Sequence, residues 1–343
     1  MDSLLPMTAF TLAGRFIMHA LLVFSCAAGI SGVVDLFRST PLFARRSGVL
    51  PGCVAVLFVG GFLWICWFHY QIFTHISLEL PAGMVDWLNR QLAAANRGQA
   101  YGLPLYDPVS PPRYCIPVWI ENEKYFFWFM SFGLMAFWTH CRMENHRLRA
   151  VLRIFLGIQA CILFFVADPF QNPLPKFFAE IAPWFDAGQN PMARFGLFMR
   201  LYPKMVFYYN AEYMWFHPPL LFLSYAAITM TFIASIFMLA RREQSVEAMG
   251  YAYAKFGYFM LTLGMLLGYP WALKAWGPNW WWDPKICSSI MMWAIFSTYL
   301  HTRLYANKKW MWYFTSILGI LCFAAMVFTF LASFFFPGEH TFQ

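Results

Sequence analysis

The sequence predicts an all-α polytopic membrane protein. Of its 343 residues, 60% are hydrophobic and only 12% are charged, whereas charged residues make up about 25% of an ordinary soluble domain. Several apolar runs approach or exceed the ~20 residues that an α-helix needs to cross ~30 Å of hydrocarbon. An open sheet would leave backbone polar groups unsatisfied in lipid, so helices are the expected spanning elements.

Eight apolar runs are candidate membrane spans. We expect them at residues 8–34, 50–72, 125–141, 150–168, 218–240, 251–271, 286–303 and 311–336. The long segments 73–124 and 169–217 are expected to lie outside the membrane. Within them, 84–98 predicts a short helix, and 190–207 alternates basic and apolar residues as a helix lying in the interface does. Because no repeat or linker divides the chain, we expect one membrane domain over 1–343.

Basic residues cluster in every second loop, and this pattern sets the expected orientation. The clusters are Arg38, Arg45 and Arg46; Arg142, Arg147, Arg149 and Arg153; Arg241 and Arg242; and Arg303, Lys308 and Lys309. Loops rich in Lys and Arg stay cytoplasmic, so both termini and the two long segments are expected outside an inner membrane of the bacterial type. The net charge of +8 then reflects topology, and no nucleic-acid partner is expected.

The eight cysteines are scattered and form neither a C-x-x-C nor a C-x-x-C-H motif. The first absence argues against dithiol redox chemistry, and the second argues against a covalent c-type haem on this chain itself. Cys115 and Cys287 both fall on the expected outer side. They could form a disulfide, or they could be inert packing residues as most membrane cysteines are.

The segment WGPNWWWDPK, residues 276–285, gathers four tryptophans in one expected outer loop. They are Trp276, Trp280, Trp281 and Trp282. Tryptophans of a membrane belt usually spread around the bundle, whereas a cluster of flat indoles, each with one N–H donor, suits a large planar ring with a few polar edges. Asp283 and Pro284 predict a helix start in which Asp283 caps backbone N–H groups, and that role is compatible with ligand binding.

Two histidines are expected on the same outer side as this loop. His217 begins the fifth span in the stretch YMWFHPPLLFLSY, and His340 follows the eighth. Two imidazoles can fill both axial positions of a haem iron, although the pattern would equally allow a metal ion, a quinone pocket or a simple interfacial histidine. Cations available for anionic groups of a bound ring are Lys274, Lys285, Arg194, Arg200 and Lys204.

A third histidine, His301, ends the seventh span in the inner half of the membrane. Ionisable residues at such depth are usually functional, but a histidine there could also reach the cytoplasmic surface.

These motifs resemble the haem-handling proteins of cytochrome c biogenesis, the CcmF/NrfE/CcsA type with its WWD signature. WGPNWWWDPK is similar to that signature, HPPLLFLSY to the first external histidine motif, YLH at His301 to the membrane-embedded histidine, and GEHTF at His340 to the second external histidine. ADPFQNPL, GQNP and PVWIENEKYFFW resemble further elements of the CcmF branch. The likeness covers roughly 113–343 and is most specific over 213–343, the expected haem-handling core.

The resemblance implies that haem b lies transiently against the tryptophan loop, near Asp283, with His217 and His340 on its iron. A second b-type haem can lie within the membrane in this family, and His301 matches one of its ligands. Its partner ligand is either His140 or His19, and His140 is favoured because its depth matches that of His301. The implied function is a haem lyase component that presents haem to apocytochrome c, within a hetero-oligomeric complex of maturation proteins.

Two departures from the family pattern leave the transfer step open. Ile286 stands where the family usually has Glu, and Glu121-Asn122-Glu123 replaces an E-G-S element. The alternative is a membrane anchor or electron-transfer subunit of a respiratory complex, with a permanent haem or a pocket that holds lipid or quinol. An exporter of haem is a third reading, for which the sequence supplies no gate or coupling residue.

Overall fold

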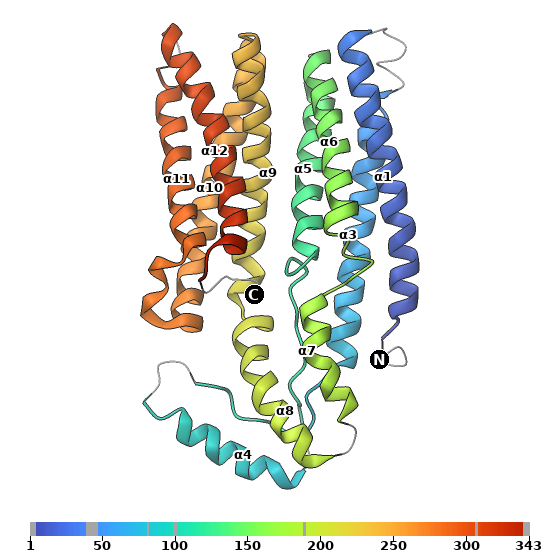
Figure 1. Cartoon of the computed structure of the whole chain (residues 1–343), viewed down its shortest axis with the longest axis vertical. Helices are drawn as coiled ribbons and strands as arrows, with labels where there is room; N and C mark the ends of the chain where they lie inside the picture. The colour runs from blue at the N-terminus through green and yellow to red at the C-terminus, as the bar shows by residue number, and fades with distance from the viewer. Residues whose placement is uncertain are drawn as a thin grey trace.

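The computed structural model describes residues 5–38, 47–80, 82–98, 102–187, 190–305 and 308–338. Its long helices are α1 (Met7–Phe37), α3 (Leu50–His75), α5 (Glu123–Arg142), α6 (His146–Val166), α9 (Tyr213–Ala240), α10 (Gln244–Trp276), α11 (Pro284–Arg303) and α12 (Lys309–Phe335). Each overlaps one predicted span, and successive helices run in opposite directions (Figure 1). The predicted all-α polytopic fold is confirmed.

Six of these helices are long and apolar enough to cross a membrane: α1, α3, α6, α9, α10 and α12. The other two, α5 and α11, have 20 residues each and are less apolar. They nevertheless stand within the same bundle, because α5 packs against α3 and α9, and α11 packs against α10 and α12. The chain is a multi-pass membrane protein, and eight spans are compatible with its structure.

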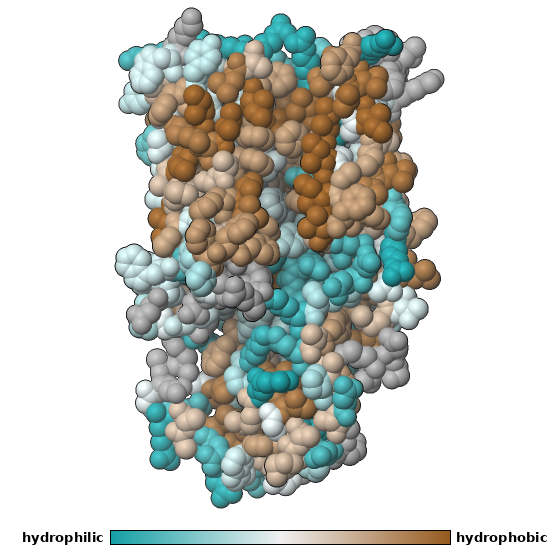
Figure 2. Space-filling model, in the orientation of Figure 1, coloured by the Kyte–Doolittle hydropathy of each residue, from teal (hydrophilic) through white to brown (hydrophobic). Residues whose placement is uncertain are grey.

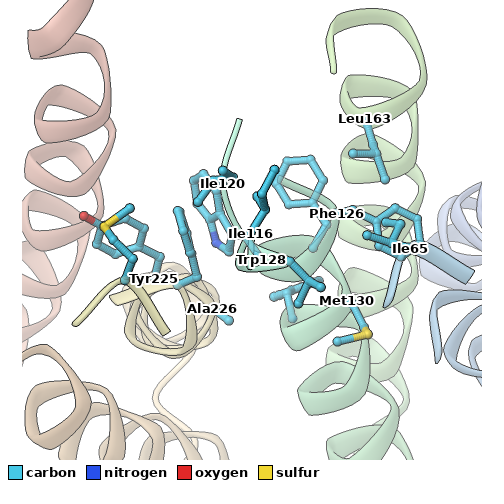
Figure 3. Packing of buried hydrophobic residues seen from close by; sticks show 14 of the residues in the cluster. Ile65, Ile116, Ile120, Phe126, Trp128, Met130, Leu163, Tyr225 and Ala226 are labelled. Carbon is cyan, nitrogen blue, oxygen red and sulfur yellow. The ribbon is translucent and has the colours of Figure 1, made fainter. Parts of the chain in front are cut away.

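The bundle has two halves that meet along α5 and α9. Helices α1, α3, α5 and α6 form one half, and α9 to α12 form the other (Figure 1). Figure 3 shows Trp128 of α5 between Tyr225 of α9 on one side and Ile65 and Leu163 of the first half on the other. The Trp128 ring lies 5.6 Å from that of Tyr225 and 6.0 Å from that of Phe330 in α12. Aromatic packing therefore fixes how the two halves sit against each other.

Small residues bring α1 and α6 close together. A Cβ on Gly157 would lie 3.1 Å from the carbonyl oxygen of Ser25 and 3.3 Å from Cα of Gly29. Such close backbone approach drives helix association in lipid, where van der Waals contact replaces the hydrophobic effect. In the same interface the sulfur atoms of Cys26 and Cys161 are 3.7 Å apart.

A buried ion pair joins the same two helices near their other end. Arg153 of α6 is 2% exposed and pairs with Asp35 of α1. Its guanidinium also donates to the Ser31 hydroxyl at 2.9 Å. Arg153 was predicted as part of a basic loop, but it lies inside the bundle because Asp35 neutralises its charge there.

Shorter helices form a layer beyond one end of the bundle (Figure 1). They are α4 (Ala82–Ala95), α7 (Pro175–Asp186), α8 (Pro191–Lys204) and the π-helical turn η1 (Met205–Tyr209). The predicted short helices at 84–98 and 190–207 are thus confirmed. Helix α1 begins and α12 ends at this end, and the basic turns between α5 and α6 and between α9 and α10 lie at the other. Figure 2 shows apolar residues over the upper part of the molecule and more hydrophilic residues toward the layer of short helices.

Cys115 and Cys287 do not pair, because both thiols are free. The backbone N–H of Cys115 donates to Oδ1 of Asn210 at 2.8 Å, which ties its segment to the end of η1. The thiol of Cys287 donates to the carbonyl oxygen of Trp281 at 3.3 Å. Of the two readings of these cysteines, the structure does not support the disulfide.

Candidate functional site

The tryptophan loop is fixed by a turn at its start and by a helix cap at its end. After α10 the chain turns on Gly277, whose φ of 73° lies in the left-handed region that favours glycine. A short 3-10 helix, η2 (Gly277–Trp282), leads to α11. Oδ1 of Asp283 accepts hydrogen bonds from the backbone N–H groups of Lys285 at 3.0 Å and Ile286 at 3.3 Å. The predicted helix cap is confirmed, and it fixes the loop on the start of α11.

The four tryptophans divide into inner and outer rings. Trp280 is 6% exposed and stacks on Trp281, with ring centroids 4.2 Å apart and planes at 21°. Tyr269 of α10 packs its ring against Trp280 at 5.5 Å. Trp276 is half-buried, whereas Trp281 is 49% and Trp282 86% exposed. The loop therefore presents two indoles outward on a base of buried aromatic rings.

His217 is held between α9 and α10 on the side of the bundle that leads to this loop. Its Nδ1 donates to the carbonyl oxygen of Gly264 at 2.6 Å, because a carbonyl can only accept. Its ring is stacked with that of Trp271 at 6.5 Å and 22°. A Cβ on Gly268 would lie 2.5 Å from Cε1 of His217, so only glycine leaves room for the imidazole. In a neutral ring with a proton on Nδ1, Nε2 carries the lone pair that can bind a metal.

The helix that carries His217 begins earlier than predicted. Residues 218–240 were expected to form the span with its prolines at the first turn, but α9 starts at Tyr213 and Pro218 lies inside it. Because proline has no N–H, the carbonyl of Met214 loses its usual partner in the helix. The indole N–H of Trp119 donates to that carbonyl at 2.7 Å. The side chain of Trp119 thus supplies the hydrogen bond that the Met214 carbonyl loses to Pro218.

His340 lies outside the described residues, so its pairing with His217 stays a prediction. The described chain ends at Gly338, which packs on the tryptophan loop. A Cβ on Gly338 would lie 2.6 Å from Oδ2 of Asp283 and 2.8 Å from Cδ of Pro284. The segment that leads to His340 therefore reaches the start of α11.

The structure does not bring His301 and His140 together. His301 is exposed on α11, and its Nδ1 donates to the carbonyl of Ser297 in the same helix at 2.8 Å. His140 is 9% exposed on α5, which lies on the other side of α9 (Figure 1). His19, the other candidate, is exposed on α1 at the far edge of the first half. The structure thus does not place His301 beside either candidate, and the partner ligand of His301 stays a prediction.

The predicted cations fall into two groups. Lys274 lies in the last turn of α10 and Lys285 in the first turn of α11, so they flank the loop. Arg194, Arg200 and Lys204 lie on α8 in the layer of short helices, where Lys204 forms an ion pair with a glutamate of α7. The lysines next to the loop are therefore the better placed cations for an anionic ligand there.

Comparison with known proteins assigns the family. The family model described as cytochrome C assembly protein matches residues 119–338, which include the loop, His217 and the segment that ends at Gly338. The chain belongs to this family. Its first helices, α1 and α3, and the short helix α4 lie before the matched region.

Relatives of the family match shorter stretches of the chain. The cytochrome c biogenesis protein CcsA of Cyanidium caldarium is 38% identical over 85 residues, which are 23% of this chain and 28% of that protein. CcsA of Trieres chinensis is 37% identical over 100 residues, or 29% of this chain and 31% of that protein. Less than a third of each of these relatives is covered.

A solved structure matches nearly the whole chain. The cytochrome c haem lyase CcmF aligns with a TM-score of 0.63 over 96% of this chain and 47% of its own, at 18% identity. At that identity the match shows a shared fold. It extends over α1 and α3, which lie before the region in which the sequence resembles the family.

The altered element PVWIENEKYFFW, residues 117–128, ties the start of α7 to the bundle. Both carboxylate oxygens of Glu121 cap α7, by accepting from the backbone N–H groups of Lys176 at 2.8 Å and Phe177 at 3.1 Å. Glu123 is 1% exposed and accepts from the N–H of Leu174 at 3.1 Å. Burial raises the pKa of Glu121 in spite of these two donors. These residues, noticed in the sequence only as departures from the family, have a structural role here.

Sequence reasoning did not identify the partners of His217. Gly264, Gly268 and Trp271 recur at intervals of four and three residues, which places them on one face of α10. That spacing is a visible signal, but its meaning depends on knowing that α9 packs on this face.

Proposed function

We propose that the chain holds haem at its outer face and presents it for attachment to apocytochrome c, as the haem lyase component of cytochrome c maturation. The observation that carries the proposal is the setting of His217. Its Nδ1–H···O=C bond to Gly264 fixes both the tautomer and the ring orientation, as such outer partners do for histidines that ligate metals. Family membership supports haem as the cargo.

The surroundings of His217 fit a flat, iron-bearing ring. Trp281 and Trp282 offer exposed indole faces, and Lys274 and Lys285 flank them for the propionate groups. The indole N–H of Trp280 is buried and has no acceptor among the residues that the structure describes. A donor left without a partner costs free energy, so an oxygen-bearing ligand at the loop would relieve that cost.

The chain acts by position and orientation in this proposal. Haem supplies vinyl groups, and a cysteine thiol of the apocytochrome adds across each double bond, with sulfur on one carbon and the proton on the other. His217 and His340 hold the iron until the cytochrome supplies its own ligand. The position of Gly338 supports this role for His340. Gly338 packs against Asp283 in the tryptophan loop, and His340 follows Gly338 by only two residues.

The proposal includes the orientation of the chain in the membrane. Basic turns at the far end of the bundle favour a position of the tryptophan loop and both termini outside an inner membrane of the bacterial type.

A second b-type haem on His301 would need its other ligand from a partner chain, since His301 faces outward. This need favours a hetero-oligomeric complex. Quinol has no observation in its favour among the described residues, and the family match does not favour a respiratory anchor.

An absorption spectrum of the purified protein in detergent tests this function. We expect haem to copurify, and His217→Ala and His340→Ala each to lower the haem content at least about tenfold, since losing one axial ligand costs well over 1.4 kcal/mol. His75→Ala is the matched control, because His75 is exposed and its Nδ1 donates to the carbonyl of Gln71 in the same helix, α3. Haem that also passes to a C-x-x-C-H peptide under reducing conditions supports the lyase role. Haem retained through both substitutions would contradict it.

A further inference from the structure

A groove of about 530 Å³ opens between α5 and α10, where the two halves of the bundle meet. This volume falls in the range of ~300–1,000 Å³ that small-molecule sites have. The groove lies along the last two turns of α5 and the first turns of α10, near the basic loops and far from the tryptophan loop. It is therefore separate from the candidate haem site.

Most of the groove is apolar and adaptable. Met135, Met143 and Met249 line it, and flexible thioether side chains fit irregular apolar ligands well. On its wall the hydroxyl groups of Thr139 and Tyr253 lie 2.8 Å apart and bond to each other. These polar groups are satisfied, so water would gain little by filling the space.

One charged residue stands at the end of the groove. Arg142, the last residue of α5, is the charged residue among those that line it. Its guanidinium lies 5.0 Å from the ring centroid of Trp138, which holds it at the rim. The ion pairs formed by Arg153, Lys204 and Arg303 with described residues do not involve Arg142. Its charge is thus available to an anionic ligand.

Three acidic residues lie close in sequence to the groove, and none is paired with Arg142. Glu144, which follows Met143, is exposed, is not among the lining residues and takes part in none of the ion pairs above. Glu243, just before α10, accepts hydrogen bonds from the side chains of Asn145 and Ser245. Glu247 of α10 is paired with Arg303 of α11, within the second half of the bundle. The groove therefore combines an apolar length with a single positive end at the level of the basic loops.

We propose that this groove binds an anionic phospholipid, with its phosphate on Arg142 and an acyl chain along the three methionines. Basic pockets between membrane helices near the cytoplasmic surface are suited to anionic headgroups, because lipids of that leaflet carry negative charge. A haem in this groove would lack an imidazole, since no histidine is among the lining residues. This site does not depend on the proposed function of the outer loop.

Native mass spectrometry of the delipidated protein, titrated with phosphatidylglycerol or phosphatidylethanolamine, tests the site. We expect phosphatidylglycerol to bind more tightly, and Arg142→Gln to weaken it about fivefold, the effect of one basic residue near a membrane surface at ~1 kcal/mol. Arg242→Gln is the matched control, because Arg242 is basic, lies near the same end and packs over a tryptophan as Arg142 does, but it is not among the residues that line the groove. We expect that control to bind as the unchanged protein does.

A second variant tests the apolar part of the groove. Ala252 lines it and is exposed, so Ala252→Trp should fill the space and weaken both phospholipids while the melting temperature stays unchanged. Equal losses in Arg142→Gln and Arg242→Gln would overturn the proposal, because the effect would then be general surface attraction. Displacement of the lipid by added haem, with a haem spectrum that depends on Arg142, would overturn it as well.

Discussion

Gly268→Ala tests the setting of His217 without touching the histidine itself. The new Cβ would lie 2.5 Å from Cε1 and 2.6 Å from Nδ1 of the imidazole, whereas carbon atoms in contact stay ~3.5 Å apart. The ring must therefore move by about 1 Å. Its hydrogen bond to Gly264, now 2.6 Å, would then lengthen by up to about 1 Å, which takes it to the limit of hydrogen-bonding distance.

The expected cost of this change falls on haem binding. In the free protein the ring can move away from the new Cβ, but to hold the iron it has to return to the overpacked position. That return costs ~1–3 kcal/mol, which corresponds to roughly 5- to 150-fold in affinity. Folding should be spared, because alanine is favoured over glycine within a helix by ~1 kcal/mol. The assay is a haem titration followed by absorption, with the helicity of each variant checked by circular dichroism.

The control is Gly60→Ala in α3, where an added Cβ meets nothing within 4 Å. We expect this variant to bind haem as the unchanged protein does. If Gly268→Ala folds and binds haem with the same affinity and spectrum as the control, the packing of His217 against α10 has no part in binding. The argument for His217 as a positioned ligand would then be wrong.

Three further predictions concern the bundle. Copper-phenanthroline oxidation should cross-link Cys26 to Cys161, whose sulfurs are 3.7 Å apart, as detected by mass spectrometry of the joined peptides. Asp35→Leu should lower the free energy of unfolding by roughly 3–5 kcal/mol, because it leaves Arg153 buried without its partner. Adding Arg153→Met to the same chain should restore most of that free energy. Thermal melts in detergent measure both variants. Because the pKa of Glu121 is raised in the folded state, the free energy of unfolding should fall as pH rises above the ordinary value of 4.5; Glu121→Gln should flatten that part of the pH profile.

The fold could be predicted from the sequence because lipid restricts the choice of structure so strongly. Backbone groups must be satisfied within each span, and the bilayer sets the length of the span. Each of the eight expected runs lies on a helix for that reason. The start of α9 was missed because two prolines normally mark a first turn. Here Trp119 accommodates Pro218 by donating to Met214, a contact between segments far apart in the chain.

The candidate site could be predicted only in part. Asp283 caps α11 as expected because a cap depends on residues next to it in sequence. The outward direction of Trp281 and Trp282, and the burial of Trp280, depend on neighbours from α10 that local sequence does not identify. The pairing of His301 with His140 rested on equal depth alone, and depth does not say which way a helix faces. His301 turns outward on α11, so depth was not enough.

The close contact of α1 with α6 limits how far this protein can be cut down. The family match starts at residue 119, yet the stretch before it supplies the backbone against which Gly157 rests and the carboxylate that neutralises Arg153. A fragment trimmed to the shared region would expose a glycine groove and an orphan cation to lipid. The first helices are therefore part of the folding unit, and any minimal version of the protein has to keep them.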